Sequence, residues 1–488
     1  MAEGDLAAQT PVPGPAPTKK ESLYADHVKI HSRSIKGTFR SLKWAALYVL
    51  LGLYYIGPFI RWDRGPGAPD QALLIDMTGR RAYFFMIEIW PQEVYYLTGL
   101  LILGAIGLFL VTALFGRVWC GFTCPQTVWT DLFIRVERLV EGDRNARIKL
   151  DKAPLSLNKI GRKLLKHGLW LLIAFATGGA WILYFGDAFE ILGDFFVGGE
   201  SPTVYGFTAL FTGTTYVLAG WAREQVCIYM CPWPRFQSAM FDEHSMIVTY
   251  EEWRGEPRAK YKRGEDFSQR GDCVDCGLCV QVCPTGVDIR KGQQMACIGC
   301  ALCVDACNSI MDRYKLPRGL ITYDSISNQV AREKGEATKL RLIRPRTILY
   351  ATVLAIVAAV LVVSLSSRSR LEINIQRDRA PLFVTLSDGD IRNGYTYKVL
   401  NMERAEKHYT LRTAGIPGAT MHVIGVSPEG ATQADLSVKP DTVGTFKVYV
   451  TVPRGNLQAK STEMNFVLTD KETGDEHGHE TVFIGPAR

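Results

Sequence analysis

Cysteine is missing from the last part of this chain of 488 residues, because none of its 12 cysteines lies after Cys307. Disulfides therefore cannot hold the C-terminal part together, and it must fold around its own core. No apolar segment with a small-residue cleavage site follows the Pro-rich first 20 residues at once, so we expect no cleaved signal peptide. The net charge of +7 is mild, and the basic residues cluster beside apolar blocks, which argues against a nucleic-acid-binding surface.

Eight cysteines form two tandem runs, each with the spacing Cys-x2-Cys-x2-Cys-x3-Cys. This spacing is typical of bacterial two-cluster ferredoxins, in which the fourth cysteine of each run binds the cluster of the other run. Structural zinc sites are the alternative, but they favour one or two Cys-x2-Cys pairs. Asn308 stands where a proline usually follows the last ligand, which does not affect ligation. We therefore predict two [4Fe–4S] clusters, with cluster I on Cys273, Cys276, Cys279 and Cys307 and cluster II on Cys297, Cys300, Cys303 and Cys283.

Five apolar blocks of about 20 residues are long enough to cross a membrane. They cover roughly residues 42–60, 94–115, 168–186, 203–222 and 347–366. Since Lys and Arg favour the cytoplasmic side, the connections predict the orientation. Residues 116–167 hold eleven Lys or Arg against five Asp or Glu, whereas residues 187–202 hold four acidic residues and no basic one. We therefore predict a multi-pass protein of the bacterial inner membrane, with the N-terminus and all cysteines in the cytoplasm and the C-terminal part in the periplasm.

The sequence pattern changes at about Leu371 to short runs of alternating apolar and polar residues. Turn signals such as Asn393-Gly394 and Arg454-Gly455 separate these runs. Alternation with a period of two, broken by such turns, predicts an immunoglobulin-like sandwich, here without the paired cysteines of antibody domains.

Taken together, these patterns predict a multidomain membrane protein. It combines an α-helical bundle of five transmembrane spans, a two-cluster bacterial ferredoxin-like cytoplasmic domain and a C-terminal all-β immunoglobulin-like sandwich. The predicted parts are a disordered or basic N-terminal segment (1–40), a four-span bundle (41–222), the ferredoxin-like domain (223–345), the fifth span (346–367) and the immunoglobulin-like domain (368–488).

The other four cysteines form two Cys-x3-Cys-Pro motifs, each directly after a predicted span: Cys120, Cys124 and Pro125, and Cys227, Cys231 and Pro232. In a helix this spacing places both thiols on one face, and each proline suits the first turn of a following helix. Four converging thiols could hold a soft metal such as Cu(I) or a further iron–sulfur cluster, or act as a redox-active dithiol. Alternatively, these cysteines are small buried apolar residues. His477 and His479 could touch a metal, but they lie in an acidic segment that we expect to be solvated.

The apolar blocks, both Cys-x3-Cys-Pro motifs, the ferredoxin runs and the C-terminal strands together resemble the CcoG/FixG/RdxA-type cytochrome c oxidase accessory proteins. The resemblance covers nearly the whole chain. It implies a role in assembling cbb3-type cytochrome oxidase by reducing Cu(II) to Cu(I), with copper chaperones or other assembly factors as partners. It also implies cluster ligation by the eight cysteines from Cys273 to Cys307, and it makes Cys120, Cys124, Cys227 and Cys231 the membrane motif.

The predicted function is therefore a membrane-bound cupric reductase. Electrons would come from a cytoplasmic donor or from quinol and pass through the clusters to copper near the four membrane thiols, since thiolates favour Cu(I). Two other functions fit the same sequence. One is a quinol-linked electron conduit to a periplasmic reductase, and the other is a non-catalytic scaffold whose external domain docks the oxidase.

The orientation can be tested with reporter fusions. A reporter fused after Arg488 is expected to be active only outside the cytoplasm, and one fused near Gly255 only inside it, because the charge pattern places an odd number of spans before the C-terminal part. Equal activity of the two fusions would contradict this number of spans.

Overall fold

The computed structural model describes residues 29–65, 67–261, 267, 270–368, 371–403, 405–457 and 459–486. The predicted disordered tail, residues 1 to about 20, lies outside these residues. The chain divides into two compact units: Met1–Arg64 with Pro69–Ala358, and Gly65–Ala68 with Ala359–Arg488. The predicted bundle and the predicted ferredoxin-like domain both fall in the first unit, and the boundary between them stays a prediction.

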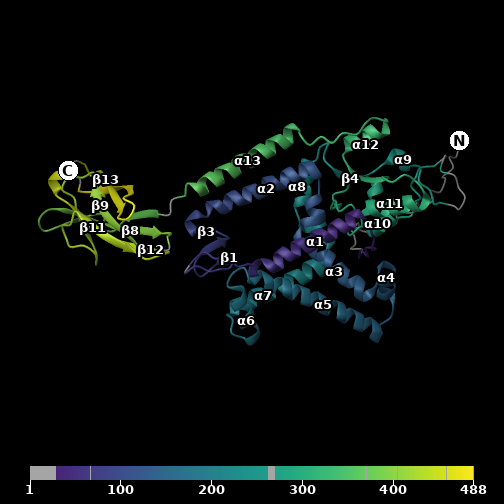
Figure 1. The fold of residues 1–488 in the computed structure, drawn as a ribbon, viewed down its shortest axis with the longest axis horizontal. Coiled ribbons are helices and arrows are strands. Elements are labelled where there is room, and N and C mark those ends of the chain that lie inside the picture. Colours follow the sequence, from purple (N-terminus) through teal and green to yellow (C-terminus); the bar gives the residue numbers. More distant parts are fainter. Residues whose placement is uncertain are drawn as a thin grey trace, which may run out of the picture. The chain divides into compact units, whose positions relative to one another are not determined.

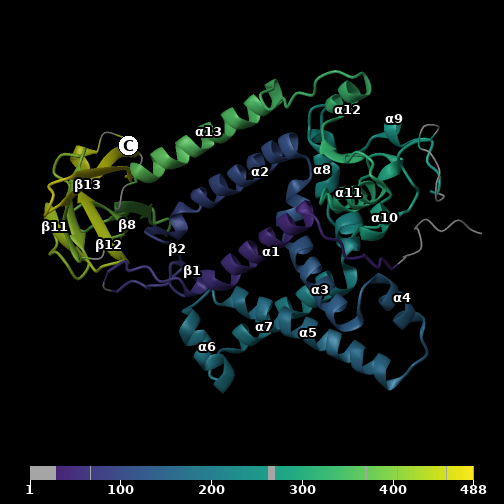
Figure 2. The same ribbon diagram turned by 45° about the vertical axis from the view of Figure 1, so that its right-hand side comes forward.

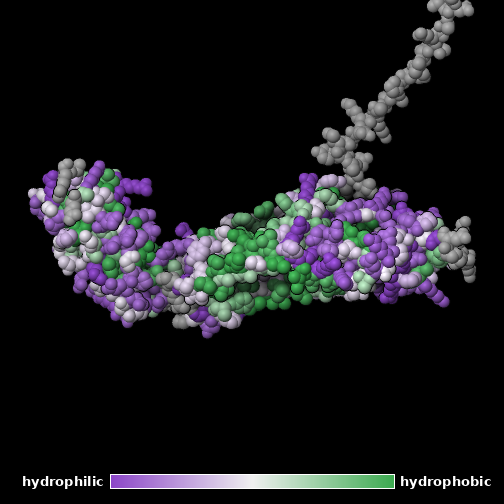
Figure 3. Space-filling model, turned by 90° about the horizontal axis from the view of Figure 1, so that it is seen from above, coloured by the Kyte–Doolittle hydropathy of each residue, from purple (hydrophilic) through white to green (hydrophobic). Residues whose placement is uncertain are grey.

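Long apolar helices dominate the first unit. Within the described part of the chain, four helical stretches are long and apolar enough to cross a membrane: Thr38–Phe59, Pro91–Phe115, Leu157–Ile182 and Pro345–Ser366. They contain helices α1 (Thr38–Ile56), α2 (Tyr95–Phe115), α5 (Leu157–Ile182) and α13 (Pro345–Ser366), the last of which runs on into the second unit. Hydrophobic side chains gather on the surface where α2 and α13 lie, as a lipid environment requires (Figure 3).

The fourth predicted span, residues 203–222, has a different local structure. It consists of α7 (Pro202–Thr215), only 14 residues long, followed directly by a π-helical segment η4 (Tyr216–Ala222). The stretch is therefore helical throughout but changes its hydrogen-bond pattern at Tyr216, a kind of irregularity that is frequent near functional sites. α7 packs along α5, where Gly178 lies so close that an added Cβ would be 2.8 Å from the backbone nitrogen of Thr212.

Shorter elements join the long helices. They are β1 (Leu73–Asp76), β2 (Arg81–Phe84), β3 (Ile87–Ile89), α3 (Pro125–Glu141), α4 (Arg144–Lys152), α6 (Ala188–Val197) and α8 (Trp233–Met240). The three strands form an antiparallel sheet between α1 and α2 that the sequence analysis did not predict. Helix α3 follows the first Cys-x3-Cys-Pro motif, as the position of Pro125 predicted.

The two cysteine runs lie in a region of short elements near the N-terminal end of α1 (Figures 1 and 2). Its elements are β4 (Ile247–Tyr250), α9 (Glu252–Gly255), α10 (Leu278–Val282), α11 (Leu302–Tyr314), β5 (Ile321–Asp324) and α12 (Ile326–Glu333). Strand β4 precedes the cysteines in sequence and pairs antiparallel with β5, which follows them. The strand pair therefore brings both ends of the cysteine-containing segment together.

The first turn of α1 fixes this region to the bundle. The carboxylate of Asp305 on α11 accepts hydrogen bonds from the backbone N–H groups of Phe39 (3.2 Å) and Arg40 (2.8 Å), which satisfies donors at the helix start. The guanidinium of Arg40 pairs with Asp131 of α3 through two hydrogen bonds of 3.0 and 2.8 Å, and both side chains are buried. Burial alone would raise the pKa of Asp131, but Lys43 and Arg40 hold it below its usual value.

Two antiparallel sheets make up the second unit. One has the order β10-β12-β8-β6, with β7 paired to β8, and the other has the order β11-β9-β13-β14. The strands are β6 (Leu371–Arg377), β7 (Val384–Thr385), β8 (Ile391–Asn401), β9 (Lys407–Ala414), β10 (Thr420–Val423), β11 (Gln433–Val438), β12 (Thr442–Val452), β13 (Ser461–Asp470) and β14 (Glu476–Ile484). Arg454-Gly455 lies between β12 and β13, as predicted, but Asn393-Gly394, predicted to separate two runs, lies within β8, where both residues pair with β12.

Both sheets contribute side chains to one hydrophobic core. Tyr395 and Tyr397 of β8 pack against Phe466 of β13, with ring centroids 5.3 and 5.5 Å apart. All three side chains are fully buried. This shared core supports the predicted sandwich and accounts for folding without a disulfide.

Candidate metal centres

The two cysteine runs have the same backbone path, because two residues of each adopt a left-handed conformation. In the first run these are Asp275 (φ 48°) and Gly277 (φ 62°), and in the second they are Gly299 (φ 69°) and Ala301 (φ 55°). Such angles suit glycine and are uncommon for alanine, so the turn at Ala301 is strained locally. Each turn reverses the chain around its middle cysteine and leads directly into α10 or α11.

The cysteines predicted to hold cluster I line one cavity. Cys273, Cys276 and Cys279 come from the first turn and the start of α10, and Cys307 comes from α11. Most of the other side chains that line the cavity are apolar. A pocket with four sulfur donors and an apolar wall fits a thiolate-ligated iron cluster, whose properties depend on limited solvent access. Cys273 and Cys279 are buried, whereas Cys276 is exposed.

The cysteines predicted to hold cluster II are also close to one another. Burial raises the pKa of Cys297 to about 12, and the neighbouring thiols of Cys300 and Cys283 act in the same direction. Burial and these same three thiols raise the pKa of Cys303. The sulfur of Cys283 accepts a hydrogen bond from the backbone N–H of Val287 at 3.3 Å. The exchange of the fourth cysteine between the runs, predicted from the spacing, is therefore compatible with the geometry of both sets.

The four thiols of the Cys-x3-Cys-Pro motifs also converge. Cys120, Cys124, Cys227 and Cys231 line a single cavity, which we call the four-thiol site. The motifs form π-helical segments, η3 (Trp119–Thr123) and η5 (Val226–Met230). In each motif the second cysteine closes the turn with its backbone N–H, from Cys124 to the carbonyl of Trp119 (2.8 Å) and from Cys231 to that of Val226 (2.7 Å). The expected placement of both thiols on one face is therefore achieved by a π-turn rather than an α-turn.

Burial controls the chemistry of these thiols. It raises the pKa of Cys120 to about 12, an effect that the other thiols of the site strengthen and Arg117 weakens. It likewise raises the pKa of Cys227 to about 12. Both thiols are therefore protonated near neutral pH, and a metal ion that bound to them would have to displace these protons.

A buried ion pair holds the second motif against the helix that follows the first. Arg223 ends η4 with φ 40° and lies four residues before Cys227. Its guanidinium contacts Glu137 of α3 at 3.1 Å, and Glu137 also pairs with Arg147 at 2.8 Å. Burial would raise the pKa of Glu137, but Arg223 and Arg147 hold it below its usual value. These contacts keep the two motifs side by side.

Sequence reasoning missed the residues that surround the four-thiol site. Cys297 and Ile298 of the second ferredoxin run line the same cavity as the four thiols, and so does Arg117. Cys300 belongs to a buried apolar cluster against which Cys120 and Cys227 pack. The paired arginines Arg117 and Arg223 before the two motifs were the available signal, but their partners are far apart in sequence.

No three His, Cys, Asp or Glu side chains among the described residues converge closely enough to bind a single metal ion. His477 and His479 lie on β14, opposite Leu468 and Phe466 of β13, in the unit without cysteines.

Three family models match the chain. A 4Fe-4S dicluster domain matches residues 222–326, and a 4Fe-4S binding domain matches residues 97–143, which include Cys120 and Cys124. The IG-like fold at the C-terminus of FixG matches residues 361–486. Iron–sulfur binding and a β-rich C-terminal domain are thus features of this chain.

Full-length relatives agree with these matches. The chain is 45% identical to the nitrogen fixation protein FixG of Rhizobium meliloti over 492 residues, which cover 95% of this chain and 94% of FixG. It is 47% identical to protein RdxB of Cereibacter sphaeroides over 474 residues, covering 96% of this chain and 98% of RdxB. A crystal structure of a FixG-related protein from Vibrio parahaemolyticus matches 24% of this chain and 97% of that chain, with 22% identity and a TM-score of 0.21.

The cluster assignment predicts distinct effects of the two terminal cysteines. Cys283→Ser is expected to remove cluster II and Cys307→Ser cluster I, each with loss of about half of the ferredoxin iron, because each set has four thiolates. Iron and sulfide analysis with electron paramagnetic resonance of anaerobically purified protein measures this. Ser309→Ala, beside Cys307 on α11, is the matched control and should keep all the iron. Stoichiometric zinc without iron would refute the assignment.

Proposed function

Because the chain belongs to the FixG/RdxA family, we propose that it is a membrane iron–sulfur oxidoreductase that reduces Cu(II) to Cu(I) at the four-thiol site, in support of cbb3-type cytochrome oxidase assembly. The observation that carries this proposal is the shared cavity, in which Cys297 of the second ferredoxin run lies beside the four membrane-motif thiols. An electron carrier and a set of soft ligands thus meet at one place.

The reaction balances as a one-electron transfer. The ferredoxin cysteines would hold two [4Fe–4S] clusters, which supply single electrons at potentials between about −700 and +450 mV. Cu(II) gains one electron and becomes Cu(I), and a cytoplasmic donor or quinol restores the electron. The thiols of the four-thiol site favour the Cu(I) product because soft sulfur ligands select it. Their protons are released when the metal binds.

We propose the inner-membrane orientation with the cysteines in the cytoplasm and the C-terminal unit in the periplasm. The basic connection 116–167 and the acidic connection 187–202 support it. The proposal counts residues 203–222 as a span in addition to the four apolar helices. Their helical structure throughout, in α7 and η4, supports this count.

A further cluster at the four-thiol site is the closest competing idea. The match of a 4Fe-4S binding domain to residues 97–143 favours it, because the cysteines in this segment are Cys120 and Cys124 of the first motif. The site would then relay electrons rather than receive Cu(II). Copper and iron contents of one preparation separate the two possibilities.

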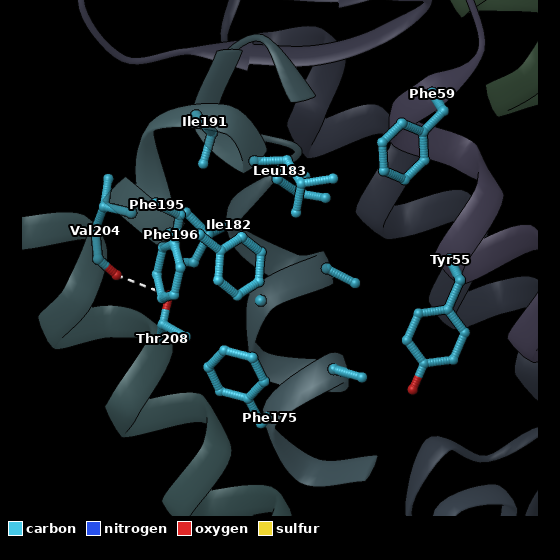
Figure 4. A pocket seen from close by; sticks show the side chains of 14 residues that line it. Tyr55, Phe59, Phe175, Ile182, Leu183, Ile191, Phe195, Phe196, Val204 and Thr208 are labelled. Atoms are coloured by element: carbon cyan, nitrogen blue, oxygen red, sulfur yellow. Dashed lines mark hydrogen bonds between the residues drawn. The ribbon is translucent and has the colours of Figure 1, made fainter. Parts of the chain in front are cut away.

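A second candidate function is the quinol-linked conduit, which an apolar cavity in the bundle favours. Side chains of α1, α5, α6 and α7 line this cavity, with Tyr55 and Phe59 on one side and Phe175 and Phe196 on the other (Figure 4). The hydroxyl oxygen of Thr177 accepts a hydrogen bond from the indole N–H of Trp129 on α3. The hydroxyl groups of Thr177 and Tyr55 are also hydrogen-bonded to each other. The cavity would take the isoprenoid tail of a quinol within reach of the helix that follows Cys124.

The copper proposal predicts selective loss in the four-thiol variants. Cys120→Ser with Cys124→Ser, or Cys227→Ser with Cys231→Ser, should lower copper binding and Cu(II) reduction by about tenfold or more, because the soft ligands are lost. The ferredoxin spectra should stay largely intact. Anaerobic mixing of reduced protein with Cu(II), with a Cu(I) chelator, measures the rate.

Met230→Leu is the matched control, because Met230 is an exposed sulfur-containing residue in the second motif that does not line the cavity. It should behave like the unmodified protein. Loss of iron in the double variants would instead favour a further cluster. Full copper binding and full reductase activity in both variants would show that these thiols are packing residues.

The quinol candidate predicts a different sensitivity. Gly179 lines the apolar cavity, and no atom lies within 4 Å of a Cβ added there, so Gly179→Leu should fill the cavity without a clash at Cβ. Reduction of the protein by a soluble quinol should then slow by about tenfold, while reduction by dithionite stays unchanged. Gly168→Leu on the same helix is the control, since it is equally open but outside the cavity. Failure of quinol to reduce the unmodified protein would remove this candidate.

A further inference from the structure

The first membrane motif touches the second ferredoxin run backbone to backbone. A Cβ added at Gly121 would lie 2.9 Å from the Cα of Cys300 and 3.0 Å from the carbonyl oxygen of Ile298. Real Cβ atoms essentially never come that close to backbone, so any larger residue at this position would force the segments apart. Only glycine allows this approach.

The motif itself does not require that glycine. In the second motif the equivalent position, directly after the first cysteine, is Ile228. Both motifs nevertheless have the same π-helical turn. Glycine at position 121 is therefore required by the contact with Cys300 and not by the shape of the motif.

The ferredoxin run contributes a glycine to the same contact. Gly299 has a φ of 69°, and a Cβ there would lie 3.0 Å from the Cβ of Arg117. Gly121 and Gly299 thus remove the side chains that would otherwise separate the two segments. Each of the two segments therefore contributes one glycine to the close packing of their backbones.

Arg117 holds the contact in register. Its buried guanidinium donates hydrogen bonds to the backbone carbonyls of Met295 and Cys297, the latter at 2.8 Å, and to that of Pro234 at 2.9 Å. Pro234 follows the second motif, so one side chain joins both motifs to the ferredoxin run. A lysine also has three N–H donors, but they sit on one nitrogen and lack the planar fork with which two guanidinium nitrogens reach these carbonyls.

The predicted cluster I site is separate from this contact, although Leu278 and Val282 of the first run pack near it. The cavity lined by Cys273, Cys276, Cys279 and Cys307 is not lined by any residue of the two membrane motifs. Cys276 is exposed, whereas Cys300 is buried. The two predicted cluster sites are therefore inequivalent, with cluster I near the surface and cluster II against the four-thiol site.

We infer that the contact between Gly121 and Cys300 is the electron junction of this protein, so that electrons leave the ferredoxin-like domain through the predicted cluster II, and the predicted cluster I faces the donor. One electron crosses the contact for each metal ion reduced, and the donor replaces it. The inference rests on the proposed electron transfer to the four-thiol site, but it holds equally if the acceptor there is a further cluster. Gly121 and Arg117 are positioning residues, which act through the distance between the two cysteine sets.

Gly121→Ala tests the junction in the full-length protein in detergent or nanodiscs. The variant should keep its iron and its ferredoxin spectra, because no cysteine changes. Oxidation of the reduced protein by Cu(II) should slow by about tenfold or more, since a small displacement at a reacting pair is costly. Hydrogen exchange of the backbone amides of residues 298–301 should rise by about tenfold, a readout that does not depend on copper.

Gly104→Ala is the matched control, because it lies on α2 and no atom lies within 4 Å of its added Cβ. Arg117→Lys provides a second variant if Gly121→Ala fails to fold, and it should show the same two changes. Electron transfer at the unmodified rate, or unchanged hydrogen exchange, in both variants would overturn the junction. Failure of the unmodified protein to reduce Cu(II) would instead overturn the proposed function. The hydrogen-exchange measurement would still show whether Gly121 packs against residues 298–301.

Discussion

The hydrogen bonds of Asp305 to the first turn of α1 are the contact on which the arrangement of the cysteines depends. Asp305 lies between Cys303 and Cys307 on α11, and a buried carboxylate needs such partners to offset its loss of hydration. Arg40 of the same turn then binds Asp131, seven residues after Cys124. One helix end therefore sets the position of the ferredoxin helix relative to the first membrane motif.

Local patterns were enough to predict iron–sulfur binding and four of the apolar helices. The spacing of the cysteines determines which thiols one tight turn can bring together, and four spans follow from hydropathy alone. The region 203–222 shows the limit of this reasoning, because hydropathy does not encode the change to π-helical bonding at Tyr216. The strands β1 to β3 were missed since they are only three or four residues long, too short for an alternating pattern to stand out.

Long-range packing could not be predicted from the sequence. The difference between Gly121 and Ile228 was visible in the two motifs, but it had no meaning until Cys300 was found beside Gly121. Arg117 stood in a basic connection and counted only as a charge for the orientation. Its three carbonyl partners lie more than a hundred residues away, and a single sequence holds no signal for such pairings. For the same reason, the sequence could not predict that Cys297 and the four membrane-motif thiols line one cavity.

The glycine contact also sets how the protein responds to its surroundings. It is made by uncharged backbone and a buried guanidinium, so dissolved ions screen it little. Because both partners belong to one chain, their approach needs no collision and does not vary with protein concentration. A partner that meets the exposed Cys276 would approach it past the ion pair of Asp275 and Arg290, and ionic strength would change that rate. The rate at which electrons enter the protein would then depend on ionic strength and on the concentration of the partner, whereas the rate of transfer across the glycine contact would not.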